Sequence, residues 1–249
     1  MKGNIAHGAG YLTRGARMLT HPSLRLFVII PLLVNIVIFG SLIFIGFSYL
    51  TALMDSMMSK LPSWLDFIEW ILWPLIGITV SLITGYLFTA VALIIASPFN
   101  SLLAEKAEEL ITGSEVESLE GIRAALLEIP RAIVREILKL LYYVPMALFV
   151  FVLSIVFNAL LPGIGALVTP ALWFLLGAWM MSIQFVDYPM DNHRLSFADV
   201  KEAVRARRLS SMGFGGAVAL CTGIPIINFF VVPAAVVGAT VLWCEELNQ

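Results

Sequence analysis

Four long stretches of this 249-residue chain carry no charged side chain. These charge-free runs are residues 26–54, 70–104, 140–186 and 209–244. One membrane crossing needs about 20 mostly apolar residues. The pattern therefore predicts an all-α integral membrane protein with a single membrane domain over residues 1–249. We expect residues 24–54 and 70–104 to form two long transmembrane helices, each tilted because it exceeds the bilayer thickness.

The third and fourth runs are interrupted by helix-breaking residues. Run 209–244 contains Gly223, Pro225 and Pro233, and run 140–186 contains Pro162 and Pro170. Both fit one frame, in which a Pro is followed eight residues later by Pro-Ala. We predict membrane-inserted, re-entrant helical hairpins at 140–186 and 209–244. Paired broken helices of this kind occur in transporters, although prolines that only kink packed helices would give the same pattern.

The distribution of positive charge predicts the orientation of the chain. Of the 15 Lys and Arg residues, only Lys60 lies between the first two charge-free runs. If both later runs return to the side they left, every other positive charge lies on one face. The positive-inside rule places that face, and both termini, in the cytoplasm. Trp64, Trp70 and Trp73 mark the opposite interface.

Composition excludes several classes of protein. Hydrophobic residues make up 60% of the chain, charged residues 13%, and the mean hydropathy is +0.94, which excludes an ordinary soluble domain. No Gly-rich phosphate loop or hydrolase motif is present, so an ATP-driven pump is not expected. Cys221 and Cys244 lie in or at the end of an apolar run and are interpreted as free thiols. Nothing indicates binding to nucleic acid.

Two charged segments are predicted to be amphipathic helices on the cytoplasmic side. Residues 1–22 place Arg14 and Arg17 opposite an apolar stripe, which predicts a helix lying in the membrane interface. Residues 105–139 form an amphipathic helical region, and Gly113 is a suitable end for its first helix. Its second half carries a basic stripe at four-residue spacing, Arg131, Arg135 and Lys139. This stripe is interpreted either as a solvated or headgroup-facing surface or as a vestibule that attracts anions.

The end of the second run has the features of an anion site. Ser97 is a good N-cap and Pro98 a good first helical residue, so we expect a helix to begin there. The free backbone N–H groups of a helix start bind anions readily. Arg25 opens the first run on the same predicted side, and its guanidinium suits a tetrahedral oxyanion. The alternative is a capped helix with an arginine that reaches the lipid headgroups.

A second cluster offers weaker candidates. Asp187, Asp191 and His193 lie within one short segment and have side chains that bind divalent cations. Pro189 lies among them, so a turn or helix end is the other interpretation, and no metal is expected. A membrane-embedded enzyme would need this cluster to hold a metal.

The stretch Pro98-Phe99-Asn100-Ser101-Leu102-Leu103-Ala104-Glu105 resembles the Pro-Phe-Asn-Gly-Leu-Leu-Ala-Glu signature of the CysZ family of bacterial sulfate permeases. The resemblance continues, in order along the chain, through four further stretches. These are Phe27-Val28-Ile29-Ile30-Pro31-Leu32-Leu33-Val34-Asn35, Leu161-Pro162-Gly163-Ile164-Gly165, Asp187-Tyr188-Pro189 and Asp191-Asn192-His193. It covers nearly the whole chain.

The resemblance implies a helical, multi-pass protein of the bacterial inner membrane that forms homo-oligomers, contacts membrane lipids and supplies sulfate for cysteine synthesis. It implies that sulfate binds at Ser101, Leu102, Leu103, Ala104 and Glu105, hereafter the 101–105 segment, together with Arg25. No cofactor is implied, the chain is not expected to be an enzyme, and sulfite is a candidate inhibitor. Ser101 replaces the family Gly, so its hydroxyl is a candidate anion donor and its Cβ a candidate obstruction. The competing hypothesis is a non-transporting scaffold or sensor that binds the oxyanion.

Overall fold

The computed structural model describes residues 3–59, 67–114 and 122–248, and every regular element in these ranges is a helix. The predicted all-α fold class is confirmed. Lys60 and Trp64 lie outside the described residues. The elements are α1 (Ile5–Met18), α2 (Pro22–Met58), α3 (Phe67–Thr112), α4 (Ile122–Leu160), α5 (Pro162–Asn192), α6 (Phe197–Ala206), α7 (Arg208–Thr222), α8 (Pro225–Leu242) and the π-helix η2 (Trp243–Leu247).

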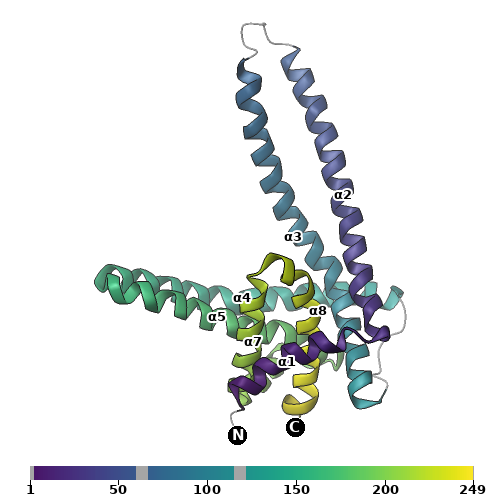
Figure 1. Ribbon diagram of the computed structural model, residues 1–249, viewed down its shortest axis with the longest axis vertical. Coiled ribbons are helices and arrows are strands. Elements are labelled where there is room, and N and C mark those ends of the chain that lie inside the picture. Colours follow the sequence, from purple (N-terminus) through teal and green to yellow (C-terminus); the bar gives the residue numbers. More distant parts are fainter. Residues whose placement is uncertain (1–2, 60–66, 115–121, 249) are drawn as a thin grey trace. The chain divides into compact units, whose positions relative to one another are not determined.

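The chain divides into two compact units. One comprises Met1–Val28 together with Ser97–Gln249, and the other is Ile29–Ala96. The second unit is a hairpin formed by α2 from Ile29 onward and by the first part of α3, as far as Ala96 (Figure 1). Within it, the rings of Phe47 and Trp73 lie 6.3 Å apart and join the two helices.

The surface of α2 is suited to lipid. Phe44 is 73% exposed and Tyr49 75% exposed, as are many aliphatic side chains along the helix. On α2, Ser41 and Ser48 are satisfied within their own helix, since they donate to the carbonyls of Val37 and Phe44 at 2.7 and 2.9 Å. In a bilayer, polar groups need such partners inside the protein.

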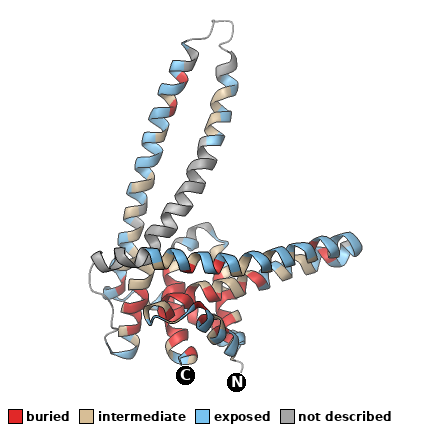
Figure 2. Ribbon diagram, turned by 180° about the vertical axis from the view of Figure 1, so that it is seen from behind, coloured by how far each residue is buried: buried red, intermediate tan, exposed pale blue. Residues whose placement is uncertain are grey.

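The core of the first unit lies where α1 crosses α7 and α8 (Figures 1 and 2). The crossing depends on glycines that bring backbones into contact. A Cβ on Gly8 would lie 2.0 Å from the carbonyl oxygen of Ser210, and one on Gly15 would lie 2.1 Å from that of Ala234. The predicted amphipathic helix exists, but its inner face contacts protein. Glycine has low helix propensity, but at these positions it is what allows the close packing.

Both predicted breaks occur at the prolines that begin the two frames. Helix α4 ends at Leu160 and α5 begins at Pro162, while α7 ends at Thr222 and α8 begins at Pro225. A proline suits the first position of a helix because its missing N–H has no partner there in any case. Near the first break, the Asn158 amide donates to Ser154 O and to Thr169 Oγ1, both at 2.8 Å, and thereby joins α4 to α5.

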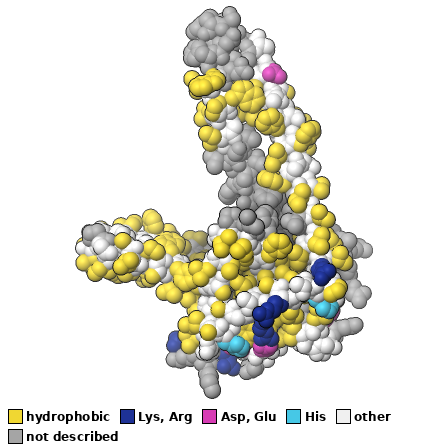
Figure 3. Space-filling view, viewed as in Figure 1, with side chains coloured by type: hydrophobic (Ala, Val, Ile, Leu, Met, Phe, Trp, Pro, Cys, Tyr) yellow, Lys and Arg dark blue, Asp and Glu magenta, His cyan; other side chains and the backbone are white. Residues whose placement is uncertain are grey.

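The two hairpins differ in length and burial. Among the described residues, Pro22–Ser56, Pro130–Leu160, Gly163–Asn192 and Phe230–Leu247 are long and apolar enough to cross a membrane. The helices α4 and α5 run side by side (Figure 1), and mostly hydrophobic side chains cover their projecting ends (Figure 3). By contrast, 72% of the Phe230–Leu247 stretch is buried inside the protein. Since α4 and α5 are each long enough to cross, the re-entrant path of this hairpin stays a prediction.

Gly15 and Gly10 offer a matched test of the α1 packing. Gly15→Ala is expected to destabilise the protein by about 1–3 kcal/mol, because the added methyl group overlaps the α8 backbone. Gly10→Ala should keep or raise stability, because no atom lies within 4 Å of its Cβ position and alanine favours helix. Thermal unfolding of both variants in detergent measures the difference. Equal melting temperatures would contradict the packing described here.

Candidate functional site

The predicted helix start at Ser97 and Pro98 is not observed, because α3 runs without a break from Phe67 to Thr112. The 101–105 segment therefore lies inside a helix, where backbone N–H groups bond to carbonyls four residues earlier. The expectation of free N–H groups at this point was wrong. Ser97 and Pro98 suit a helix start locally, yet proline is also tolerated within long membrane helices. The predicted end is correct, since Gly113 follows Thr112 with a φ of 71°.

The 101–105 segment has one buried face. Leu103 and Ala104 are 1% and 0% exposed and belong to the same core as Leu24, which precedes Arg25 in the chain. Ser101 and Leu102 lie at the edge of this face and are half-buried. Glu105 is buried, with its Oε1 3.7 Å from Nζ of Lys106, as expected for a carboxylate that pairs with a cation. A hydrogen bond from Lys106 to Glu109 raises the pKa of the Lys106 ammonium.

Arg25 lies in the first turn of α2 and is exposed. Its Nε donates a 2.9 Å hydrogen bond to the carbonyl of Thr20 in the turn that joins α1 to α2. This bond fixes the base of the guanidinium group and uses none of the hydrogens on its two terminal nitrogens. Within the described part of the chain, Arg25 is hydrogen-bonded to Thr20 and not to the 101–105 segment. Arg25 and the 101–105 segment belong to the same compact unit.

The end of α5 contacts α3 on both sides of the 101–105 segment. Asn100 Nδ2 donates to Tyr188 Oη at 3.3 Å, and Asn192 Nδ2 donates to the carbonyl of Ser101 at 2.9 Å. Further along α3, His193 Nε2 lies 2.8 Å from Oε1 of the buried Glu108. Three side chains from α5 and its C-cap thus hold one polar edge of α3.

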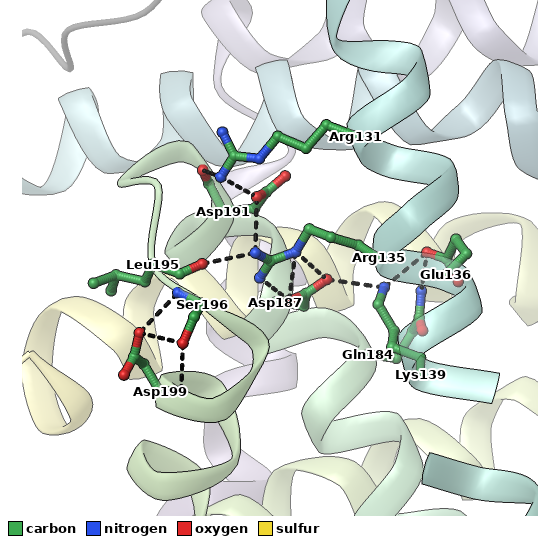
Figure 4. A network of polar contacts seen from close by, with 10 residues as sticks. All are labelled: Arg131, Arg135, Glu136, Lys139, Gln184, Asp187, Asp191, Leu195, Ser196 and Asp199. Carbon is green, nitrogen blue, oxygen red and sulfur yellow. Dashed lines mark hydrogen bonds and ion pairs between the residues drawn. The ribbon is translucent and has the colours of Figure 1, made fainter. Parts of the chain in front are cut away.

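A network of buried charges joins the end of α5 to α4 (Figure 4). Arg135 on α4 pairs with Asp187 on α5, and Lys139 Nζ lies 2.9 Å from the other oxygen of Asp187. Arg131 and Arg135 contact Asp191 Oδ1 at 2.7 and 3.0 Å. Lys139 also contacts Glu136 at 2.7 Å. Arg135, Lys139 and Asp187 are 7%, 2% and 3% exposed, so these pairs are largely removed from solvent.

This network corrects two interpretations of the basic stripe. Arg135 and Lys139 are buried against α5 and neutralised, so they form neither a solvated surface nor an anion-attracting vestibule. The apolar side of α4 is the exposed one, with Val134 55% and Ile137 50% exposed. The helix is amphipathic in the sense opposite to a soluble helix, because its charged side is buried in the protein and its apolar side is exposed. Predicting the partners of the stripe required knowing that α5 folds back along α4.

The same contacts argue against a metal at Asp187, Asp191 and His193. Each of the three side chains already has a partner: Asp187 pairs with Arg135 and Lys139, Asp191 pairs with Arg131 and Arg135, and His193 contacts Glu108. No group of three or more potential metal ligands occurs among the residues that the structure describes. The enzyme hypothesis required a metal held by these three side chains, and their ion pairs compete with that role.

The two ends of the chain are joined by polar contacts. Arg14 Nη1 donates to Glu245 Oε2 at 2.7 Å, and His7 Nδ1 lies 3.1 Å from Glu246 Oε1. The buried Tyr11 donates to Glu246 Oε1 at 3.0 Å. Burial and these carboxylates raise the pKa of Tyr11, so its hydroxyl stays a donor at physiological pH. The contacts place α1 and η2 on one side of the protein, in agreement with termini on a common face.

Sequence reasoning missed Asn100, Tyr188 and Asn192 as functional candidates. The available signal was the spacing of Tyr188 and Asn192, four residues apart and therefore on one side of α5. Nothing in the spacing identified α3 as their partner.

Comparison with known proteins identifies close relatives of this chain. A family model described as sulfate transporter CysZ/etoposide-induced protein 2.4 matches residues 11–233. The sulfate transporter CysZ of Vibrio cholerae is 42% identical over 97% of this chain and 94% of its own length. The sulfate transporter CysZ of Salmonella typhi is 42% identical over 96% of this chain and 92% of its own length. That of Vibrio parahaemolyticus is 41% identical over 97% and 96%.

The buried charge network predicts a large effect of one substitution. Asp187→Ala is expected to destabilise the protein by about 3–5 kcal/mol, because Arg135 and Lys139 would remain buried without this partner. Asp55→Ala, which removes an exposed carboxylate from α2, should change stability by less than about 0.5 kcal/mol. Denaturant or thermal unfolding in detergent compares the two. A similar small effect at both sites would show that the network contributes little.

Proposed function

The chain belongs to the sulfate transporter CysZ/etoposide-induced protein 2.4 family, and we propose that it is a sulfate permease of the bacterial inner membrane. The observation that carries this proposal is the 42% identity to named sulfate transporters over 97% of the chain. Several long apolar helices accord with a multi-pass membrane protein. The relatives are named as transporters, and this chain is accordingly a transporter and not an enzyme.

We further propose that the transported sulfate supplies cysteine synthesis. Passage is passive or coupled to an ion, and no covalent step or cofactor is involved. One subunit with two long helical hairpins can hardly enclose a sealed pathway, so we propose that the protein works as a homo-oligomer. The breaks at Pro162 and Pro225 then lie along the pathway, where broken helices expose backbone groups that need polar partners.

We propose that sulfate is bound by Arg25 and the 101–105 segment. The bond to Thr20 leaves the terminal guanidinium nitrogens able to donate two parallel hydrogen bonds to one oxyanion. The segment lies inside α3, so its own side chains and not free helix N–H groups provide further donors. Ser101 has the hydroxyl for this role and lies at the edge of the buried face. Glu105 stays turned into the protein and does not contact the anion.

Labelled-sulfate uptake into liposomes that contain the purified protein tests the function. Wild-type uptake should be saturable and reduced by sulfite. Arg25→Ala should lower transport efficiency by about 10- to 100-fold, as expected for losing hydrogen bonds from a charged donor. Arg17→Ala is the matched control, since Arg17 is also an exposed arginine near the start of the chain and should leave uptake unchanged.

Two results would overturn parts of this proposal. Folded wild-type protein that binds sulfate but gives no uptake above empty liposomes would favour the non-transporting scaffold or sensor. If Arg25→Ala leaves uptake unaffected, the proposal that the protein is a transporter would stand, but its anion site would lie elsewhere.

Two substitutions at Ser101 distinguish the roles of its hydroxyl and its Cβ. If the hydroxyl donates to sulfate, Ser101→Ala and Ser101→Gly should both raise the concentration for half-maximal uptake by about three- to tenfold. If the Cβ obstructs the anion, Ser101→Gly should lower that concentration. We expect the first result, because the helix leaves no free backbone N–H for a glycine to expose.

A further inference from the structure

The 101–105 segment is held from outside by one amide. Asn192 is the last residue of α5, and its Nδ2 donates to the carbonyl of Ser101 at 2.9 Å. In an unbroken helix that carbonyl already accepts from the backbone four residues later. The Asn192 bond is therefore not needed to satisfy Ser101, and its effect is to fix α3 relative to α5 at the first residue of the segment.

Two more contacts bracket the segment. The Asn100 bond to Tyr188 lies just before it, and the His193 contact with Glu108 lies two turns after Ser101, about 10 Å along the helix axis. Leu103 and Ala104 between them are buried in the core. A helix held at both ends along one edge cannot rotate about its axis, so the direction of the Ser101 Cα–Cβ bond is fixed.

The donor is itself held in place from α4. Asp191, the neighbour of Asn192, contacts Arg131 at 2.7 Å and Arg135 at 3.0 Å. One turn earlier, Asp187 pairs with Arg135 and Lys139 (Figure 4). The end of α5 is thus anchored on one side by buried ion pairs, and it presents its amide to α3 on the other.

We propose that Asn192 is a positioning residue for anion binding, which holds the 101–105 segment in the rotation that presents Ser101 to sulfate. The inference rests on the proposed function. Asn192 does not itself contact the anion. Loss of its amide donor should therefore weaken binding without removing the site.

Sulfate binding and hydrogen exchange, measured on the purified full-length protein, test this inference. Asn192→Leu removes the donor with little change in size. It should raise the Kd for sulfate about three- to tenfold with the number of sites unchanged, as expected for losing one neutral hydrogen bond. Exchange at the backbone amides of residues 102–105 should become faster. Asn192→Ala, which also lacks the donor and adds no charge, repeats the test if the leucine variant does not fold.

Asn158→Leu is the matched control, because it removes another amide that donates to a backbone carbonyl, that of Ser154, and to Thr169, at the opposite end of the α4–α5 pair from Asn192. It should leave both the Kd and the exchange of residues 102–105 unchanged. A purely structural role for Asn192 would lower the number of active sites and leave Kd constant, which would overturn the inference. The inference would also be overturned if the backbone amides of residues 102–105 exchanged at the wild-type rate in an Asn192 variant.

The readouts separate this inference from the proposed function. If the wild-type protein binds no sulfate, the proposed function fails, and with it the role of Asn192 toward sulfate. Faster exchange in Asn192→Leu would then still show that the amide holds the segment. If the wild type binds sulfate and Asn192→Leu binds equally well, only the positioning role fails.

Discussion

Charges removed from water need partners, and this constraint organises the first unit of the protein. Moving an ion out of water costs several kcal/mol unless an opposite charge and hydrogen bonds replace the solvent. Lys139 and Arg135 on α4 meet this requirement with Asp187 on α5. Because Asp187 has two cationic partners, it fixes both the distance between the helices and their register. The end of α5, which contacts α3, takes its position from these pairs.

A second constraint brings the start and end of the chain together. Gly15 and Gly238 let α1 approach α8 at backbone distance, and Arg14 pairs with Glu245 just beyond α8. The first 28 residues thereby join the compact unit formed by the last 153, although the hairpin Ile29–Ala96 separates them in the sequence. Arg25 comes at the end of this N-terminal part. Its attachment to Thr20 places the proposed anion donor in the same unit as the 101–105 segment.

Features that depend on neighbouring residues in the sequence were predicted well. The breaks at Pro162 and Pro225 and the helix end at Gly113 follow from the backbone restrictions of single residues. Features that depend on partners distant in the sequence were not predicted well. The local rules that favour a helix start at Ser97 are outweighed by the continuity of a long apolar helix. The basic stripe was misjudged because its carboxylate partners lie on the returning helix.

For the candidate site, the sequence identified the residues that resemble a family signature but not what surrounds them. Ser101 could be named from the motif and Arg25 from its place at the start of the first charge-free run, whereas the contact between Asn192 and Ser101 joins residues that are 91 positions apart. Side-chain amides form such bonds in many environments, so their partners cannot be inferred from residue type. The three-dimensional arrangement is needed to show that Tyr188, Asn192 and His193 all contact α3.

The inverted polarity of α4 also bears on how the protein is made. During synthesis α4 leaves the ribosome before α5, so Arg135 and Lys139 reach the membrane before Asp187 exists. Each unpaired cation opposes insertion by about 2.5–3.5 kcal/mol at the centre of a bilayer, and by less near its surface. We therefore expect α4 to reach a stable position in the membrane only after its partner helix has emerged, so that the two helices insert into the bilayer together.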